Sequence, residues 1–178
     1  MVYLFLANGF EEIEALCPLD FLRRAGQEVK TVGVNEKIIT GSHNISVVCD
    51  LTATELDLNS PFDMIILPGG LPGSTNLDQS PVVDYFIKRA TKEDKYICAI
   101  CAAPFMLGKR GLLSGKHACC YPGFENQLSG ATIETGVCVD GKIITASAMG
   151  KSHEFSLAII EALCGQEMKE KLKKAVLL

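Results

Sequence analysis

The sequence predicts an α/β fold in which a mostly parallel sheet is covered by helices on both faces. Three observations predict it. Short apolar runs alternate with amphipathic stretches along the 178 residues. The apolar runs are too short for helices and are typical of strands buried on both faces. The stretches between several of them are long enough for crossover helices, which join parallel strands through right-handed connections.

The chain begins with an expected strand–helix–strand unit. Val2 to Leu6 is the first buried strand. Glu11 to Ala25 has helical spacing with acids in its first turn, where the helix dipole favours them. Gly26 closes this helix, and Pro18 inside it should kink or restart it. Glu28 to Val34 is the second strand, parallel to the first.

The middle of the chain predicts a hairpin, a buried strand and a helix. Lys37 to Val48 is expected to form the hairpin, turning at Gly41-Ser42. Asp63 to Leu67 is wholly apolar after its first residue and should be a fully buried strand. Pro81 to Thr91 is expected to be helical, because proline is favoured in the first turn of a helix.

The second half continues the alternation. Asp140-Gly141 is a strong signal for a type I′ hairpin turn. Gly165 separates the last two helices. The expected elements are the strand Tyr96 to Ile100, the helix Ala102 to Arg110, the strand His117 to Cys120, the hairpin Val137 to Ala146, and the helices Ser152 to Leu163 and Gln166 to Val176.

This fold class predicts where a site should lie. In open parallel sheets, ligands bind beyond the carboxyl ends of the strands. The loops Ala7 to Phe10, Pro68 to Gly73 and Ile100 to Pro104 occupy that edge. No repeat, linker or low-complexity segment interrupts the pattern, so residues 1–178 are expected to form one domain.

Composition excludes several classes of protein. The net charge is -4 and the basic residues are scattered, apart from a lysine cluster near the C-terminus, so we expect no nucleic-acid partner. No apolar run is long enough to span a bilayer, so no membrane association is expected. The apolar N-terminus has no basic start and turns acidic at once, which argues against a signal peptide and indicates a cytoplasmic protein.

The eight cysteines do not suggest a disulfide scaffold, because such scaffolds are usually shorter and have no large core. Reduced and mostly buried thiols are the better interpretation. Only Cys98 and Cys101 have C-x-x-C spacing, and no second pair matches it, so we expect no metal site.

Cys101 is the strongest candidate for chemistry. It lies between a buried strand and an expected helix, where unpaired N–H groups and the helix dipole favour a thiolate. A nucleophile elbow needs small residues two positions to either side, and alanines stand there in place of glycines. From the local sequence alone, a structural cysteine buried at the end of a strand is as well supported as a reactive one.

A glycine pair and a glutamate complete the candidate site. Gly69-Gly70 follows a buried strand, and its N–H groups can bind an oxyanion, although a plain turn would be favoured for an isolated Pro-Gly-Gly. Glu11 and Glu12 are expected to be solvated. Glu14 lies on the apolar flank of its helix, where a carboxyl has a raised pKa; the alternative is an acid at the rim that turns to water.

Several segments in order resemble the ThiJ/PfpI family of the class I glutamine amidotransferase-like superfamily. The resemblance is strongest to the branch of the parkinsonism-associated protein deglycase and its bacterial relatives, and it extends almost from end to end. The segments are Leu6–Glu14 (LANGFEEIE), Leu22–Gly26 (LRRAG), Asp63–Gly70 (DMIILPGG), Ala99–Pro104 (AICAAP), Asp140–Thr145 (DGKIIT) and Glu154–Leu163 (EFSLAIIEAL).

The resemblance implies a flavodoxin-like α/β sandwich and a homodimer. It implies that Cys101 is the reactive, oxidation-prone cysteine and that Glu14 is a protonated acid bonded to its sulfur. Gly69, Gly70 and the amide of Ala102 would form the anion-binding pocket.

Two positions depart from the family. Tyr121 stands where some relatives have a pocket histidine, and His43 where some have an anion-binding arginine. A phenol donates hydrogen bonds but is a poor base near neutral pH. The family's glyoxalase and deglycase chemistry relies on a cysteine, a glutamate and a histidine acting together. We therefore expect any such activity to be weak.

Two functions remain open. In the first, Cys101 attacks a small electrophilic carbonyl, Glu14 carries a proton, and the Gly70 and Ala102 amides hold the oxyanion, which gives a glyoxalase- or deglycase-type enzyme of stress protection. In the second, an oxidant converts Cys101 to sulfenic or sulfinic acid, and the protein is a non-enzymatic sensor or chaperone. No cofactor is expected, because the loop from Ala7 to Phe10 offers few donors for a flavin phosphate.

Overall fold

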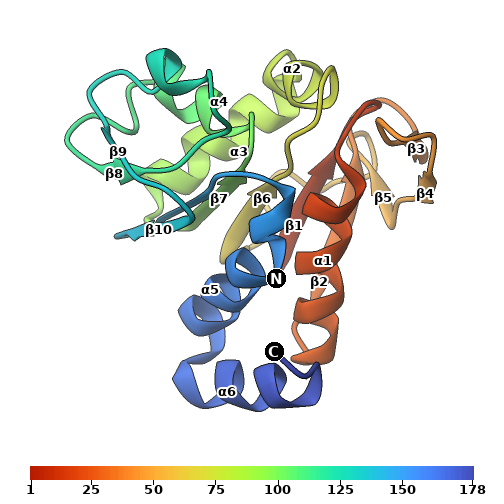
Figure 1. Cartoon of the computed structure of the whole chain (residues 1–178). Helices are drawn as coiled ribbons and strands as arrows, with labels where there is room; N and C mark the ends of the chain where they lie inside the picture. Colours follow the sequence, from red (N-terminus) through yellow and green to blue (C-terminus); the bar gives the residue numbers. More distant parts are fainter.

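The computed structural model describes residues 1–178 and is built on a seven-stranded sheet (Figure 1). The strand order is β10-β11-β7-β6-β1-β2-β5, and every neighbouring pair is parallel except β10–β11. The expected mostly parallel sheet is confirmed. Its strands are β1 (Val2–Leu6), β2 (Val29–Gly33), β5 (Leu51–Thr52), β6 (Met64–Leu67), β7 (Tyr96–Ile100), β10 (Val137–Asp140) and β11 (Ile143–Ala146).

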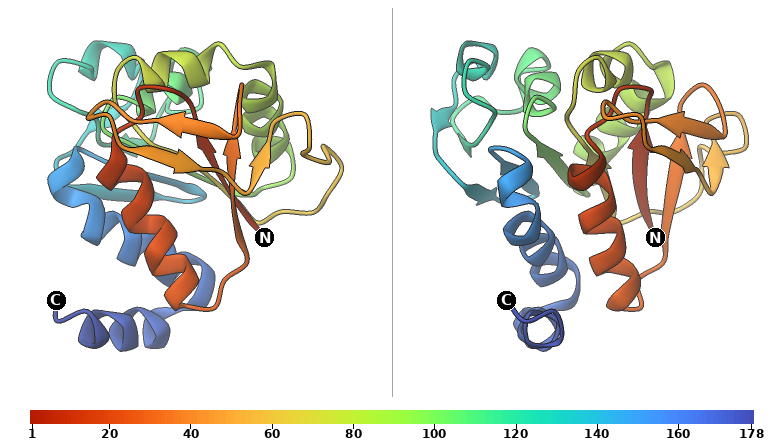
Figure 2. Two further views of the ribbon diagram at one scale, coloured as in Figure 1. Left: turned by 90° about the vertical axis from the view of Figure 1, so that its right-hand side faces the viewer. Right: turned by 45° about the vertical axis from the view of Figure 1, so that its right-hand side comes forward.

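Helices cover both faces of the sheet. One face carries α1 (Glu12–Arg24) and α5 (Ser152–Cys164), which pack side by side, and α6 (Gln166–Ala175) crosses their far ends (Figure 2). The other face carries α3 (Pro81–Lys92) and α4 (Pro104–Lys109). The short helix α2 (Gly73–Asp78) connects β6 to α3.

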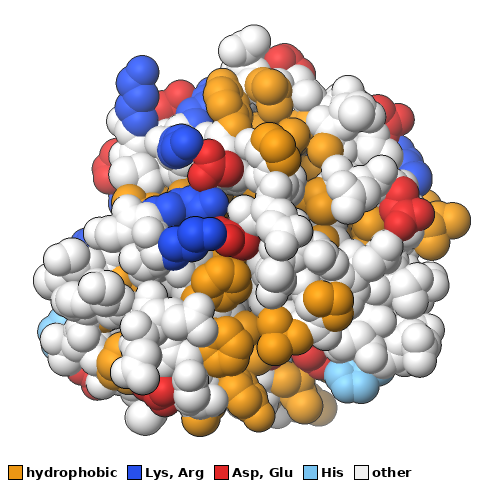
Figure 3. Space-filling view, turned by 90° about the horizontal axis from the view of Figure 1, so that it is seen from above, with side chains coloured by type: hydrophobic (Ala, Val, Ile, Leu, Met, Phe, Trp, Pro, Cys, Tyr) orange, Lys and Arg blue, Asp and Glu red, His pale blue; other side chains and the backbone are white.

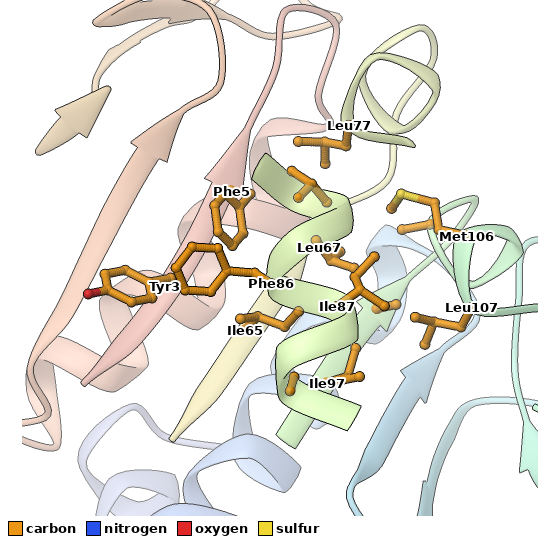
Figure 4. Close-up of a cluster of buried hydrophobic side chains, with 14 of the residues drawn as sticks. Tyr3, Phe5, Ile65, Leu67, Leu77, Phe86, Ile87, Ile97, Met106 and Leu107 are labelled. Carbon is orange, nitrogen blue, oxygen red and sulfur yellow. The ribbon is translucent and has the colours of Figure 1, made fainter. Parts of the chain in front are cut away.

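Strand alternation divides the core into two layers. Tyr3 and Phe5 of β1 face α3, where they pack against Phe86 (Figure 4). Leu4 and Leu6 of the same strand face α1 and α5. Successive side chains of a strand point to opposite faces, so a strand covered on both sides is apolar at every position.

Two small sheets lie outside the main one. The hairpin of β3 (Ile38–Thr40) and β4 (Ser46–Val48) is confirmed, while β8 (His117–Ala118) pairs with β9 (Thr132–Ile133) in parallel. Two 3-10 turns, Glu125–Gln127 and Met149–Lys151, complete the structure. None of the helices combines the length and the apolar character that crossing a bilayer requires.

The helix α1 continues through Pro18 without restarting. Three other local expectations were wrong. The β10–β11 turn is centred on Gly141 and Lys142, with only the glycine at positive φ, which matches a type II′ turn rather than type I′. The helix after Cys101 begins only at Pro104. The strand expected from His117 to Cys120 ends at Ala118. The elements α2, β5 and β9 were not predicted, because each is too short to leave a periodic pattern in the sequence.

Candidate active site

The three loops expected at the carboxyl edge of the sheet do meet there. The Glu11 amide donates to the Gly69 carbonyl at 3.0 Å, and the Gly73 amide donates to the Gly9 carbonyl at 3.1 Å. These bonds tie the loop after β1 to the loop after β6. Cys101 follows β7, the next strand in the sheet, so its side chain lies beside both loops.

Cys101 has the backbone of a nucleophile elbow. Its φ is +65°, in the left-handed region. This conformation is strained for a residue other than glycine, and such strain is often found at functional sites. The bonds on either side hold it there: its amide donates to the Ala146 carbonyl at 2.9 Å, and its carbonyl accepts from the Tyr121 amide at 2.8 Å. Strand β11 and the loop that contains Tyr121 therefore hold the strained turn together.

The glycine pair leaves room for the reacting groups. A Cβ at Gly69 would lie 2.6 Å from Glu14 Oε2 and 2.7 Å from the Cys101 Cβ, so only glycine fits between them. Gly70 has φ +84°, and its amide, like that of Ala102, donates toward the Cys101 sulfur. The structure therefore brings together the residues proposed from the sequence.

Glu14 is buried, with 1% of its surface exposed, so the alternative of a solvent-facing acid is wrong. Its amide donates to Glu11 Oε2 at 2.7 Å, which anchors the first turn of α1. Its Oε2 accepts from the Gly69 amide at 3.0 Å, whereas Oε1 is buried without any hydrogen-bond partner. Burial raises the pKa of Glu14 to about 7. A carboxyl with an unpartnered buried oxygen is well suited to hold a proton there and donate it.

The Cys101 thiol does not have the low pKa that its position suggested. Burial and then the charge of Glu14 raise the pKa of Cys101 to about 12, and the amides of Ala102 and Gly70 only partly oppose this. The helix dipole contributes little, since α4 is six residues long and begins three residues later. An ionised Glu14 thus suppresses the thiolate, so a thiolate at Cys101 requires the proton to remain on Glu14.

The two residues that depart from the family pattern, Tyr121 and His43, have different surroundings. Tyr121 is half exposed, and its hydroxyl makes no hydrogen bond within the protein. His43 binds Glu12 instead of the pocket, with 2.7 Å between Nδ1 and Oε2 and 2.7 Å between the amide and Oε1. Glu12 was expected to be solvated but is 2% exposed. It fastens the β3–β4 hairpin to the start of α1.

Two contributions could not be seen in the sequence. The Ala146 carbonyl fixes the elbow, and the Met149 backbone opposes the rise in the pKa of Glu14. Both are main-chain groups from the far end of the chain, so residue type gives no signal for them. All eight cysteines are free thiols; Cys98 is fully buried, as expected of a core residue.

Comparisons with known proteins show which family the chain belongs to. The model of the DJ-1/PfpI family matches residues 1–162. The protein DJ-1 homolog B of Arabidopsis thaliana is 37% identical over 91% of this chain, which spans only 38% of that protein's length. The glutathione-independent glyoxalase DJR-1.2 of Caenorhabditis elegans is 31% identical over 94% of this chain and 90% of its own.

The likeness extends to solved structures. A structure of Toxoplasma gondii DJ-1, oxidized, has a TM-score of 0.93 and 35% identity, and the match covers 99% of this chain and 97% of the other. The family model and these matches cover nearly the whole sequence. The chain belongs to the DJ-1/PfpI family.

Proposed function

We propose that this protein is a cysteine-dependent stress-protection enzyme that converts small reactive aldehydes, with Cys101 as nucleophile and Glu14 as proton carrier. One observation carries the proposal. A buried acid with an unpartnered oxygen stands beside an elbow cysteine, with Gly69 held between them. An acid whose pKa is raised to about 7 can both give and accept a proton near neutral pH.

The reaction begins with a proton held on Glu14 and a negative charge on sulfur. The Cys101 Sγ attacks the aldehyde carbon of a 2-oxoaldehyde, and the carbonyl electron pair moves to oxygen. Glu14 gives its proton to that oxygen, which yields a hemithioacetal. The Gly70 and Ala102 amides, which donate toward the resting sulfur, are the nearest donors for the developing oxyanion.

The ionised Glu14 then moves the second proton. It removes the proton from the former aldehyde carbon, and the hydroxyl proton on that carbon passes to the neighbouring carbonyl oxygen, which gives an enediol-type intermediate. Glu14 then returns the first proton to the neighbouring carbon, so the former aldehyde carbon becomes the carbonyl of a 2-hydroxy acid thioester. Water hydrolyses the thioester and regenerates the thiol. The net change adds one water to the 2-oxoaldehyde and needs no external oxidant. The relative named a glyoxalase, which matches 94% of this chain, supports this reaction class.

A Cys101→Ala variant tests the proposal. Steady-state consumption of methylglyoxal should be measurable in the wild type and absent in the variant, with the product identified as lactate. A matched Cys98→Ala variant removes a fully buried thiol of the core and should keep the activity. Equal activity of the Cys101→Ala variant and the wild type would refute the catalytic assignment.

The same geometry favours a second candidate function, a redox sensor or chaperone. Two amides and a protonated Glu14 around the Cys101 sulfur are donors that can hold a sulfenate or sulfinate oxygen. Limited peroxide treatment followed by peptide mass spectrometry should show oxygen first on Cys101. Modification of Cys138 or Cys164 before Cys101 would refute this function, because these thiols are also partly exposed.

We further propose a cytoplasmic homodimer. Eight free thiols fit a reducing compartment. The β3–β4 hairpin exposes Ile38 and Val48, a directly paired couple that is 54% and 70% exposed, and Ile45, which is 53% exposed. Hydrophobic side chains also gather on the face at the carboxyl edge of the strands (Figure 3). Apolar surface of this kind is typical of protein interfaces.

A further inference from the structure

Two buried side-chain atoms of this protein have no hydrogen-bond partner, Glu14 Oε1 and the Ser152 hydroxyl. Glu14 belongs to the site described above, whereas Ser152 takes no part in the reaction proposed for it. Ser152 is wholly buried and is the first residue of α5. Burying a polar group without a partner costs free energy, so nearly all such groups in native proteins bind another protein group or an ordered water.

The contact between α1 and α5 places these two residues at the same level. Both helices begin at the carboxyl edge of the sheet, because each follows a strand of its parallel part (Figure 2). The Ser156 hydroxyl of α5 donates to Cys17 Sγ of α1 at 3.3 Å. Glu14 precedes Cys17 by three residues, and Ser152 precedes Ser156 by four. Each therefore lies one turn nearer the start of its helix than this contact.

Glu14 and Ser152 also lie on the same side of the contact. On two helices that run in the same direction, three residues back along one and four back along the other turn toward the same side. That side is the inner one, because Glu14 and Ser152 are 1% and 0% exposed. The complementary steps lead to Ile13 and His153, which are exposed. The Met149 backbone, which opposes the rise in the pKa of Glu14, also brings the start of α5 to this carboxyl.

A single water molecule meets the needs of both unpartnered atoms. Glu14 Oε1 and the Ser152 hydroxyl face each other across the contact between the helices but are not bonded to each other. A water molecule can donate to Oε1 and accept from the hydroxyl at the same time. Buried waters in proteins typically bridge polar groups that would otherwise be unsatisfied.

We propose that Ser152 is a positioning residue for Glu14, and that its hydroxyl binds Oε1 through one buried water molecule. The inference rests on the Cys101–Glu14 pair of the proposed function. A donor at Oε1 stabilises the ionised carboxylate and so opposes the effect of burial. Ser152 therefore favours the ionised Glu14 that is left when its proton passes to the hemithioacetal oxygen. It acts through Glu14 and touches neither the substrate nor the sulfur.

The pH profile of Cys101 alkylation by iodoacetamide tests this role. In Ser152→Ala the ionised form of Glu14 is less stable, so the step near pH 7 should move upward by about one unit, as expected for one hydrogen bond to a charged group. The rate above the step should rise by up to about tenfold, because the negative charge shifts from Glu14 to sulfur. Loss of packing alone would not produce this pair of changes.

Two further variants serve as controls. Ser156→Ala removes a buried hydroxyl one turn along α5 that already contacts the Ser152 carbonyl and Cys17, so its midpoint should match that of the wild type. Ser152→Thr keeps the hydroxyl and should keep the wild-type midpoint. Ser152→Ala removes only a hydroxyl that has no partner in the protein and should fold. An unchanged midpoint in Ser152→Ala, or the same shift in Ser156→Ala, would overturn the inference.

A crystal structure of the wild type tests the water directly. It should show one water within hydrogen-bond distance of both Glu14 Oε1 and Ser152 Oγ, and its absence there would overturn the inference. Neither measurement requires aldehyde turnover. If Glu14→Gln abolishes the step while Ser152→Ala leaves it unmoved, the role of Ser152 fails and the Cys101–Glu14 pair stands. If the midpoint shifts but methylglyoxal is not consumed, only the proposed enzymatic function fails.

Discussion

At the residue scale, the site depends on one proton shared between two buried groups. Burial raises the pKa of Glu14 to about 7, and burial together with an ionised Glu14 raises the pKa of Cys101 to about 12. Losing the first proton near neutral pH leaves one negative charge on the pair, and losing the second is strongly opposed. The reactive form is the one in which sulfur holds the charge and Glu14 holds the proton.

Replacing Glu14 should change the pH profile of Cys101 alkylation. In the wild type the rate should show a step near pH 7, where the pair loses its first proton. Glu14→Gln retains a donor and no titrating group, so this step should disappear while alkylation near neutral pH continues. Glu14→Leu removes the donor, so it should react more slowly than Glu14→Gln at each pH. Iodoacetamide kinetics on the three proteins measure this. Coincident profiles would contradict the pairing.

In the proposed reaction we expect Tyr121 to limit the rate, because a phenol is a poorer general base than an imidazole. Tyr121→His should therefore raise the rate of methylglyoxal consumption by about tenfold or more, which is part of the roughly 100- to 10,000-fold that a general base contributes. Tyr121 is half exposed, so the substitution should leave the melting temperature nearly unchanged. A Tyr85→His variant on the outer face of α3 serves as the control. No gain for Tyr121→His with an intact fold would favour the redox function.

At the scale of elements, the loop after β6 lets Glu14 and Cys101 approach each other, because Gly69 has no side chain. In Gly69→Ala, the added methyl group would meet Glu14 Oε2, the Cys101 Cβ and the Ile100 carbonyl, the last at 3.0 Å. Such overpacking should lower the free energy of unfolding by about 1–3 kcal/mol and slow Cys101 alkylation.

Gly150→Ala is the matched control for Gly69→Ala. A Cβ added at Gly150 would have no atom within 4 Å, and the φ of Gly150 is not positive. Its free energy of unfolding should change by less than about 0.5 kcal/mol. Urea unfolding of both variants measures the difference. Equal stabilities would show that the contacts around Gly69 relax without cost.

At the scale of the whole molecule, the burial of Glu14 should make stability depend on pH. Its pKa is about 7 when folded and near 4.5 when unfolded, so the folded state binds more protons between these values. The stabilisation is complete below about pH 4.5 and is lost as the pH rises through 7, about 3 kcal/mol in total. Subtracting the unfolding free energy of Glu14→Gln at each pH isolates this contribution. A difference that stays constant from pH 4.5 to 8 would contradict it.

The proposed dimer makes a second prediction for the whole molecule. Val48→Asp places a charge on the exposed β3–β4 hairpin and should convert dimer to monomer in sedimentation equilibrium. Val139→Asp is the control: Val139 is 55% exposed, but it lies on β10 at the far edge of the sheet. The control should stay dimeric. A monomeric wild type, or dissociation of both variants alike, would refute the hairpin as the interface.

The sequence by itself determined the sheet and most of the elements, and it indicated the candidate residues of the site. Strands buried on both faces are apolar at every position, so β1, β6 and β7 are visible in the residues alone. Cys101, Glu14 and the glycine pair could be proposed because each lies next to such a strand or on an apolar helix flank. Elements of two or three residues, such as β5 and β9, could not be found, because they complete no period.

Only the tertiary structure decided the chemical state of the site. Local sequence suggested a thiolate at a helix start, whereas the fold buries the thiol beside an acid and raises its pKa. Glu12 likewise looks solvated in the sequence, yet the β3–β4 hairpin covers it. The pKa of a group depends on the charges and water around it, and those neighbours come from loops that are distant in the chain. Residue types fix which groups can react, and packing fixes where their protons lie.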